Sequence, residues 1–432
     1  MPALPELLAP AGDMEKLRTA LAYGADAVYL AMGSLSLRSK AGFSPQELPA
    51  ALNLAHAHGR RVYLCLNILA REEHLVRAET ILTDLASLSL DGLIIADPAL
   101  LDLALDRLPG VPIHLSTQAG ASNSGSVRFW SRQGCARVNL ARELSHQDIR
   151  AAARACPDME LEVFVHGAMC MAVSGRCLMS AHLNDRPANL GLCAHPCRYE
   201  YRPVSLSLEE RERTGRVTWE VECDPPFAKV MSPDDLCLLP YLRWFWKTGI
   251  RALKIEGRMK SSLYLALVVG AYRAGLDALA KDRFRPDPLM AVLARATTRS
   301  LGTGFFLNRQ RIFCGPRPRR DTGPVLARII ERLGPDSWLV EAKQAWNSDQ
   351  DFEVLKPDLE PAPIPARCYR LEDEEGMGQT KVHPGWIGIL RTERPEPQED
   401  LFLVTSQPWA RPSDDTVRVQ PNPNVHKHCA QR

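Results

Sequence analysis

Short β-rich apolar runs alternate with amphipathic stretches through residues 1–285, and this alternation limits the fold more than any other feature. Stretches such as Met14–Tyr23 and Pro45–His58 repeat their apolar residues at helical spacing. The runs between them are rich in branched or aromatic side chains, as strands usually are. Eight such runs are present: Glu6–Ala9, Ala27–Ala31, Val62–Leu66, Gly92–Ala96, Ile113–Ser116, Arg137–Leu140, Leu161–Val165 and Ala252–Ile255.

Eight β–α units predict an α/β fold, a closed (β/α)8 barrel of the TIM type, with the carboxyl ends of all strands on one functional face. A doubly wound open sheet is the alternative, and it ranks second because no Gly-rich dinucleotide fingerprint follows any strand. The last two strands are separated by about 80 residues, too many for one helix and its loops. The sequence therefore predicts an insertion at 167–248, after the seventh strand.

A proline-containing stretch, Arg283–Pro288, marks the end of the predicted barrel, because proline removes a backbone donor and favours extended neighbours. We expect a basic linker over 286–322. Beyond it, short β-branched and aromatic runs separated by turn residues predict a small all-β domain over 323–412. We expect the remaining residues, 413–432, to form a disordered tail.

Composition indicates a globular protein with no overall charge that would mark a nucleic-acid partner. The 432 residues include 53 basic and 51 acidic side chains, a formal net charge of +2, so any RNA site must be a local patch. The amino terminus lacks the features of a secretory signal. The longest apolar run, Leu263–Tyr272, is about half of the roughly 20 residues that a bilayer span needs. We expect a cytoplasmic protein with no membrane segment and with reduced thiols.

Half of the 12 cysteines fall within the predicted insertion. A single buried cysteine is usually a small apolar side chain, but six thiols in a segment with few apolar runs indicate a metal centre that stabilises it. Zinc sites usually contain Cys-x-x-Cys pairs, which this segment lacks, whereas its spacings suit an iron–sulfur cluster held by several loops. The spacing leaves open which four of these six bind such a cluster: Cys170, Cys177, Cys193, Cys197, Cys223 and Cys237.

Polar residues directly after the predicted strands are the candidate substrate contacts. At such positions arginine or lysine can bind a carboxylate or phosphate, and glutamate or histidine can move a proton. A structural salt bridge is an equally good explanation for each one alone. Lys254 and Glu256 stand out because strand alternation points both to one side, next to Gly257. We predict catalytic roles for Glu143, His166, Lys254 and Glu256, and substrate binding by Asn67, Gln118, Arg142 and Arg258.

A dense basic run lies where the barrel should meet the β-domain, interleaved with Phe313. Arginine-rich loops with an aromatic residue suit phosphate contact and base stacking in RNA recognition. A solvated charged linker explains the run almost as well. The predicted RNA contacts are Arg309, Arg311, Arg317, Arg319 and Arg320.

The segment EVFVHGAMCMAVSGRCLMS at 162–180 closely resembles the signature of the collagenase-like proteins known as peptidase family U32. The segments LLAPAG at 7–12, GADAVY at 24–29, STQ at 116–118, AREL at 141–144, SPDDLC at 232–237 and KIEGRMK at 254–260 resemble that family as well. The resemblance implies a barrel that carries a 4Fe-4S cluster. Carried over position by position, the ligands are Cys170, Cys177, Cys193 and Cys237, with Cys197 as the alternate.

Family members with an added β-domain resemble enzymes that hydroxylate the tRNA wobble uridine or a 23S rRNA cytidine, whereas members with the barrel alone resemble hydroxylation factors of ubiquinone synthesis. The resemblance therefore implies hydroxylation of wobble uridine to 5-hydroxyuridine, with prephenate as a candidate co-substrate and an unknown electron or oxygen donor. The family usually carries Asn-Arg-Gly-aromatic before Gly-Phe, but this chain reads TRSL at 298–301 before Gly304 and Phe305. Hydroxylation of an rRNA cytidine or of a quinone precursor thus stays an alternative.

Peptidase activity is a further alternative. Peptide hydrolysis needs an activated nucleophile or a metal-bound water. The sequence contains neither His-Glu-x-x-His nor Gly-x-Ser-x-Gly. A redox centre at the barrel mouth fits the sequence better than a protease does.

Overall fold

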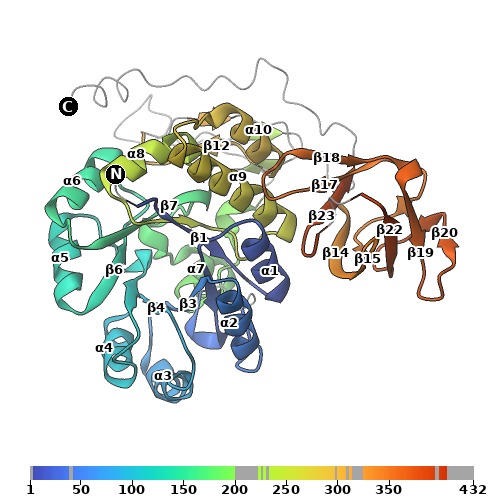
Figure 1. The fold of residues 1–432 in the computed structure, drawn as a ribbon. Helices are drawn as coiled ribbons and strands as arrows, with labels where there is room; N and C mark the ends of the chain where they lie inside the picture. The colour runs from blue at the N-terminus through green and yellow to red at the C-terminus, as the bar shows by residue number, and fades with distance from the viewer. Residues whose placement is uncertain are drawn as a thin grey trace.

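The computed structural model describes residues 3–37, 42–199, 222–224, 227–229, 233–296, 299–307, 311–313, 325–394 and 398–405. Its central feature is a closed barrel of parallel strands in the order β11-β1-β2-β3-β4-β5-β6-β7, in which β11 pairs with β7 to close the ring (Figure 1). This confirms the predicted (β/α)8 fold. The barrel strands are β1 Glu6–Pro10, β2 Ala27–Ala31, β3 Arg61–Leu66, β4 Gly92–Ile95, β5 Ile113–Leu115, β6 Cys135–Asn139, β7 Glu160–Ala168 and β11 Ala252–Ile255.

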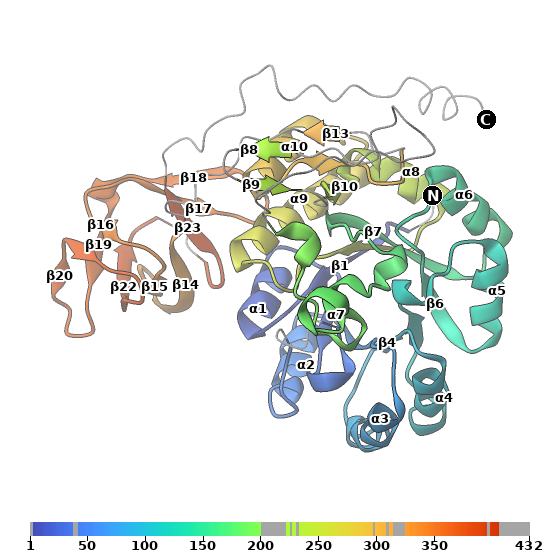
Figure 2. The same cartoon turned by 180° about the vertical axis from the view of Figure 1, so that it is seen from behind.

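Helices between the strands cover the outside of the barrel (Figures 1 and 2). Several begin at a side chain that accepts a hydrogen bond from the first turn, among them Asp13, Asp97 and Ser145. These caps satisfy backbone N–H groups of the first turn and so favour the start of each helix at that residue. The helices are α1 Met14–Ala22, α2 Leu48–Ala57, α3 Glu72–Leu85, α4 Pro98–Arg107, α5 Ser124–Arg132, α6 His146–Ala155, α8 Leu242–Thr248, α9 Ser262–Ala280 and α10 Pro286–Ala296.

The first part of the predicted linker is a helix instead. α10 packs against α9 and buries Met290 and Leu293. Proline is favourable at the start of a helix because its missing N–H would have no partner there in any case. Pro286 therefore starts α10 rather than preventing it, and the linker predicted over 286–322 is wrong for 286–296.

By length and composition, α9 could cross a membrane, and it is the one such helix in the described part of the chain. However, 67% of its most apolar stretch is buried inside the protein. It packs against α1, α8 and α10, which accounts for its apolar composition.

The predicted insertion leaves the barrel at the end of β7 and returns beside it. β10, Asp235–Cys237, pairs antiparallel with the end of β7 and parallel with β12, Leu301–Gly302. The insertion also contains α7, Met179–Asn184, and the short strands β8, Glu222–Asp224, and β9, Phe227–Lys229. The chain after α10 thus comes back to the mouth of the barrel.

An antiparallel sheet forms the carboxyl-terminal region, beside α1 and α9 (Figures 1 and 2). Tyr23 Oη of the barrel donates to the Leu355 carbonyl at 2.5 Å, and Glu15 lies 3.6 Å from Arg328. The region is all-β, as predicted. Its strands are β14 Val325–Gly334, β15 Ser337–Ala342, β17 Phe352–Leu355, β18 Pro361–Ile364, β19 Tyr369–Glu372, β20 Gly378–Gln379, β22 Ile387–Thr392 and β23 Phe402–Thr405. The tail predicted over 413–432 lies outside the described residues.

Candidate functional site

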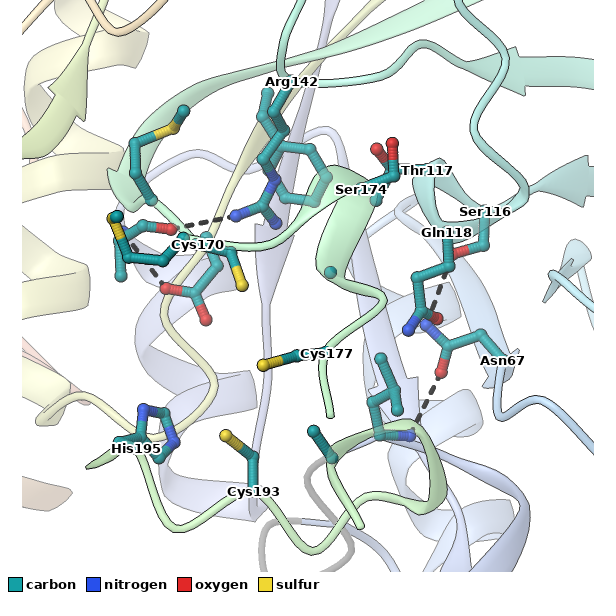
Figure 3. A pocket seen from close by; sticks show the side chains of 18 of the residues that line it. Asn67, Ser116, Thr117, Gln118, Arg142, Cys170, Ser174, Cys177, Cys193 and His195 are labelled. Carbon is teal, nitrogen blue, oxygen red and sulfur yellow. Dashed lines mark hydrogen bonds between the residues drawn. The ribbon is translucent and has the colours of Figure 1, made fainter. Parts of the chain in front are cut away.

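A pocket lies at the carboxyl ends of the barrel strands, between the barrel and the insertion (Figure 3). The lining surrounds about 1280 Å³ of empty space, counted out to the open solvent. Most of the residues singled out in the sequence line it together: Asn67, Gln118, Arg142, Glu143, Cys170, Cys177, Cys193, Cys197, Lys254, Glu256 and Arg258.

Four thiols of the insertion belong to this pocket. Cys170 is exposed, and Cys177, Cys193 and Cys197 are partly buried. Figure 3 shows Cys170, Cys177 and Cys193 turned toward the same space. Burial raises the pKa of the Cys197 thiol and the Arg198 guanidinium lowers it, while the other three cysteines raise it again. Cys197 thus lies within electrostatic reach of the other three cysteines.

Hydrogen bonds hold the loop between the first two cysteines over the barrel mouth. Ser174, in the left-handed region with φ of 49°, donates from its backbone N–H to Glu143 Oε1 at 2.5 Å. Its hydroxyl donates to Glu143 Oε2 at 3.1 Å. Arg176 Nε donates to the Gln118 carbonyl at 2.7 Å. Glu143, predicted to be catalytic, therefore anchors the cysteine loop in this structure.

Cys237 does not join the four thiols. It lies fully buried on β10, its sulfur donates to Met290 Sδ at 3.7 Å, and it is not part of the pocket lining. Burial raises its pKa to about 12, which disfavours a thiolate. Of these two cysteines, Cys197 lies in the pocket lining and Cys237 does not. The Cys223 side chain lies outside the described residues.

His166 also lies away from the pocket. Its ring lies between Tyr264 and Tyr272 of α9, with centroids 6.0 Å and 5.6 Å away, and Nδ1 is 3.5 Å from Tyr272 Oη. β7 has a bulge at Val165, where its register against β11 shifts. Phe164 lines the pocket, and the bulge turns His166 to the opposite face of the strand. The predicted role of His166 in moving a substrate proton has no support in this geometry.

Lys254 forms part of a buried ion pair on the pocket floor. Its Nζ lies 2.8 Å from Glu162 Oε1, and the two side chains are 4% and 1% exposed. Asn139 donates to the same oxygen at 2.8 Å, and the Tyr29 ring lies 4.5 Å from the ammonium group. An ion pair buried this deeply is destabilised strongly by loss of either partner. Lys254 therefore ties β11 to β7 and gives the floor a fixed polarity.

Glu256 and its neighbours shape the rim. Glu256 Oε2 accepts from the Ala168 N–H at 3.3 Å. Gly167, with φ of +110°, passes so close that a Cβ there would lie 2.4 Å from the Glu256 carbonyl oxygen. Only glycine fits at this crossing of the two loops.

Two arginines bring positive charge to the pocket. Arg142 donates to the Ala168 carbonyl at 2.9 Å, with its guanidinium 3.6 Å from the centre of the Phe164 ring. Arg258 is 5% exposed and donates to the Leu37 carbonyl. Its Nη1 is buried with no hydrogen-bond partner among the described residues.

The predicted RNA contacts cannot be placed beside this site. Arg309, Arg317, Arg319 and Arg320 lie outside the described residues, and Arg311 belongs to β13, Arg311–Phe313, whose side chains are not described.

The model of "Peptidase family U32" matches residues 12–312, well over half of the chain. This protein belongs to peptidase family U32. The U32 chain is 42% identical to "tRNA hydroxylation protein P1" of Bacillus subtilis (strain 168), over 82% of its own length and 84% of that protein. It is 36% identical to "tRNA hydroxylation protein P" of Escherichia coli (strain K12), over 70% and 74%. It is 34% identical to a 23S rRNA 5-hydroxycytidine synthase of Escherichia coli (strain K12), over 64% and 40%.

Sequence reasoning missed three residues of this U32 site. Glu162 is the partner of Lys254, and Arg198 donates to the Met169 carbonyl at 3.1 Å beside the thiols. Phe164 lies under Arg142. Glu162 and Phe164 alternate along one predicted strand, so that period could have identified them as facing the barrel interior. No comparable signal marks Arg198.

Titration of His166 should make the U32 protein less stable in acid. Burial, followed by the charge of Lys260, lowers the pKa of His166 from 6.5 to about 3, with Glu256 opposing. As the pH falls, His166 is protonated in the unfolded chain before it is protonated in the folded protein. The stability that neutral His166 contributes to the folded state is therefore complete above pH 6.5 and is lost as the pH falls toward 3. Between pH 6.5 and 5 the loss should reach up to about 2 kcal/mol. Urea unfolding of wild type and His166→Asn at both pH values measures it. Equal pH dependence of the two proteins would contradict the assignment.

Proposed function

We propose that this U32 protein is an RNA hydroxylase that converts the wobble uridine of tRNA to 5-hydroxyuridine. The observation that carries the proposal is the pocket that joins four thiols to a cationic barrel mouth. Two of the relatives above are named for tRNA hydroxylation, and the third is named for a hydroxycytidine in 23S rRNA. The likeness to the tRNA proteins is higher and covers more of each chain, which favours tRNA over rRNA.

We further propose that Cys170, Cys177, Cys193 and Cys197 hold a 4Fe-4S cluster. Thiolates are the usual ligands of such clusters, and four are required. Among the residues that the structure describes, no three His, Cys, Asp or Glu side chains are arranged to hold one metal ion. A zinc ion would need its ligand sulfurs about 2.3 Å from a single point. The four cysteines that line this pocket match the number of thiolates that a 4Fe-4S cluster requires, and such a cluster supplies electron transfer when bound.

The cationic groups of the pocket are assigned to an anionic co-substrate, for which prephenate, a dicarboxylate, is the candidate. Arg258 offers the buried Nη1, and its planar fork suits a carboxylate. Arg142, stacked on Phe164, presents a second guanidinium to the same space. Lys254, paired with Glu162, keeps the floor rigid beneath them.

RNA and an electron or oxygen donor complete the proposal. The arginines at 309, 311, 317, 319 and 320 remain the proposed phosphate contacts. The donor has to come from outside the chain, and we place the protein in the cytoplasm, where tRNA and reducing conditions coincide.

The ligand set is tested by serine substitution. Wild type purified without oxygen should contain about four iron and four sulfide per chain. Cys177→Ser and Cys197→Ser should each lose most of both. Cys237→Ser should keep them, because that sulfur lies outside the pocket. Iron and sulfide analysis with visible absorption measures this, and Cys156→Ser serves as the control for a buried thiol. Loss of iron in Cys237→Ser with retention in Cys197→Ser would contradict the assignment.

The substrate is tested by mass spectrometry of nucleosides from a strain that lacks the gene. We expect 5-hydroxyuridine and nucleosides derived from it to disappear from tRNA, with 23S rRNA unchanged. Wild type should restore the modification, and Cys177→Ser should not. Loss of hydroxycytidine from 23S rRNA alone would replace uridine by cytidine as the substrate. Unchanged profiles in both RNAs would refute RNA hydroxylation.

A further inference from the structure

Gln118 carries a side-chain amide that makes no hydrogen bond to the described part of the chain. The residue is 2% exposed and lines the pocket, yet neither Oε1 nor Nε2 has a hydrogen-bond partner among the described residues. Burying an amide with both bonds unmade is unfavourable, and native proteins rarely do so without a functional reason. The neighbouring amide of Asn67 is different, because it accepts from the Leu37 N–H at 3.2 Å and donates to Ser116 Oγ at 3.5 Å (Figure 3).

The backbone of Gln118 is fixed by contacts on both sides. It lies in the short helical turn Thr117–Ala119 directly after β5, where Thr117 Oγ1 donates to the Leu140 carbonyl at 3.1 Å. Its own carbonyl accepts from Arg176 Nε. Gly175 packs on the side chain, since a Cβ there would lie 3.7 Å from Gln118 Cγ. The amide is therefore held between the barrel mouth and the loop that joins Cys170 to Cys177.

The chemistry of an amide selects a particular ligand. It presents one acceptor and one donor side by side, whereas a carboxylate has acceptors only and would leave Oε1 unsatisfied. The anionic ligands of this pocket have Arg142 and Arg258 instead. The complement of Gln118 is a group with an adjacent acceptor and donor, and the Watson–Crick edge of uracil provides one in its O4 and N3–H. Enzymes that modify a base extrude it from the stack and read this edge inside the pocket.

We propose that Gln118 recognises the Watson–Crick edge of the base: Nε2 donates to O4 of an extruded uracil, and Oε1 accepts from its N3–H. This inference rests on the proposed function and adds the atoms that recognise the substrate. A paired amide and base edge of this kind discriminates against a mismatched edge by about 10- to 100-fold.

The test compares two anticodon stem–loop RNAs, with uridine or N3-methyluridine at the wobble position, by equilibrium binding to the full-length protein purified without oxygen. Wild type should bind the methylated RNA about 10- to 100-fold more weakly, because the methyl group removes the donor. Gln118→Met should bind the uridine RNA more weakly by a similar factor and should no longer distinguish the two. Gln133→Met, at an exposed position on the barrel surface, should behave as wild type.

The double comparison separates the role of Gln118 from simple steric effects of the methyl group. Full discrimination retained by Gln118→Met, with normal iron content, would overturn the inference. Equal binding of both RNAs by wild type would also overturn it. If the protein still modified tRNA in the cell, the proposed function would then stand without this role for Gln118. If wild type bound neither RNA and tRNA modification were unchanged in the deletion strain, both would fail.

Discussion

The pairing of β7 with β11 is the constraint on which the rest of the site depends. These strands are neighbours in the barrel although the insertion separates them in the chain, so the insertion must leave and return at the same mouth. The buried pair between Glu162 and Lys254 joins the two strands, and Arg137 stands 3.6 Å from the second oxygen of Glu162. In such surroundings a lone charge is strongly unfavourable, so the pair also fixes the register of the closure.

The cysteine loop at 170–178 is held in place mainly by polar anchors. Its large apolar side chains Val173 and Leu178 are 71% and 78% exposed, so burial stabilises this loop little. Glu143 holds Ser174, and Arg176 holds the turn that carries Gln118. Four thiols are thereby brought together in a segment whose stability would rise with a bound metal centre. The same anchors couple the cysteine loop to the amide that we assign to base recognition.

Much of the fold follows from the sequence, because strand and helix periods are local properties. All eight barrel strands were predictable in this way, and so was the insertion, from the excess length between two strands. The position of Cys237 was not, because it depends on how the chain returns: β10 pairs with β7 and turns Cys237 inward beside Met290, while Cys197 stays at the pocket. His166 was misplaced because a single bulge at Val165 reverses the alternation, and the spacing of residues does not reveal bulges.

We propose that the insertion and the barrel mouth together form one four-thiolate centre beside a base-reading pocket. Anomalous diffraction at the iron edge, from crystals grown without oxygen, tests it most directly. The account predicts a compact group of iron peaks bounded by the sulfurs of Cys170, Cys177, Cys193 and Cys197. A single zinc peak in this pocket, or iron bound by Cys237, would contradict it.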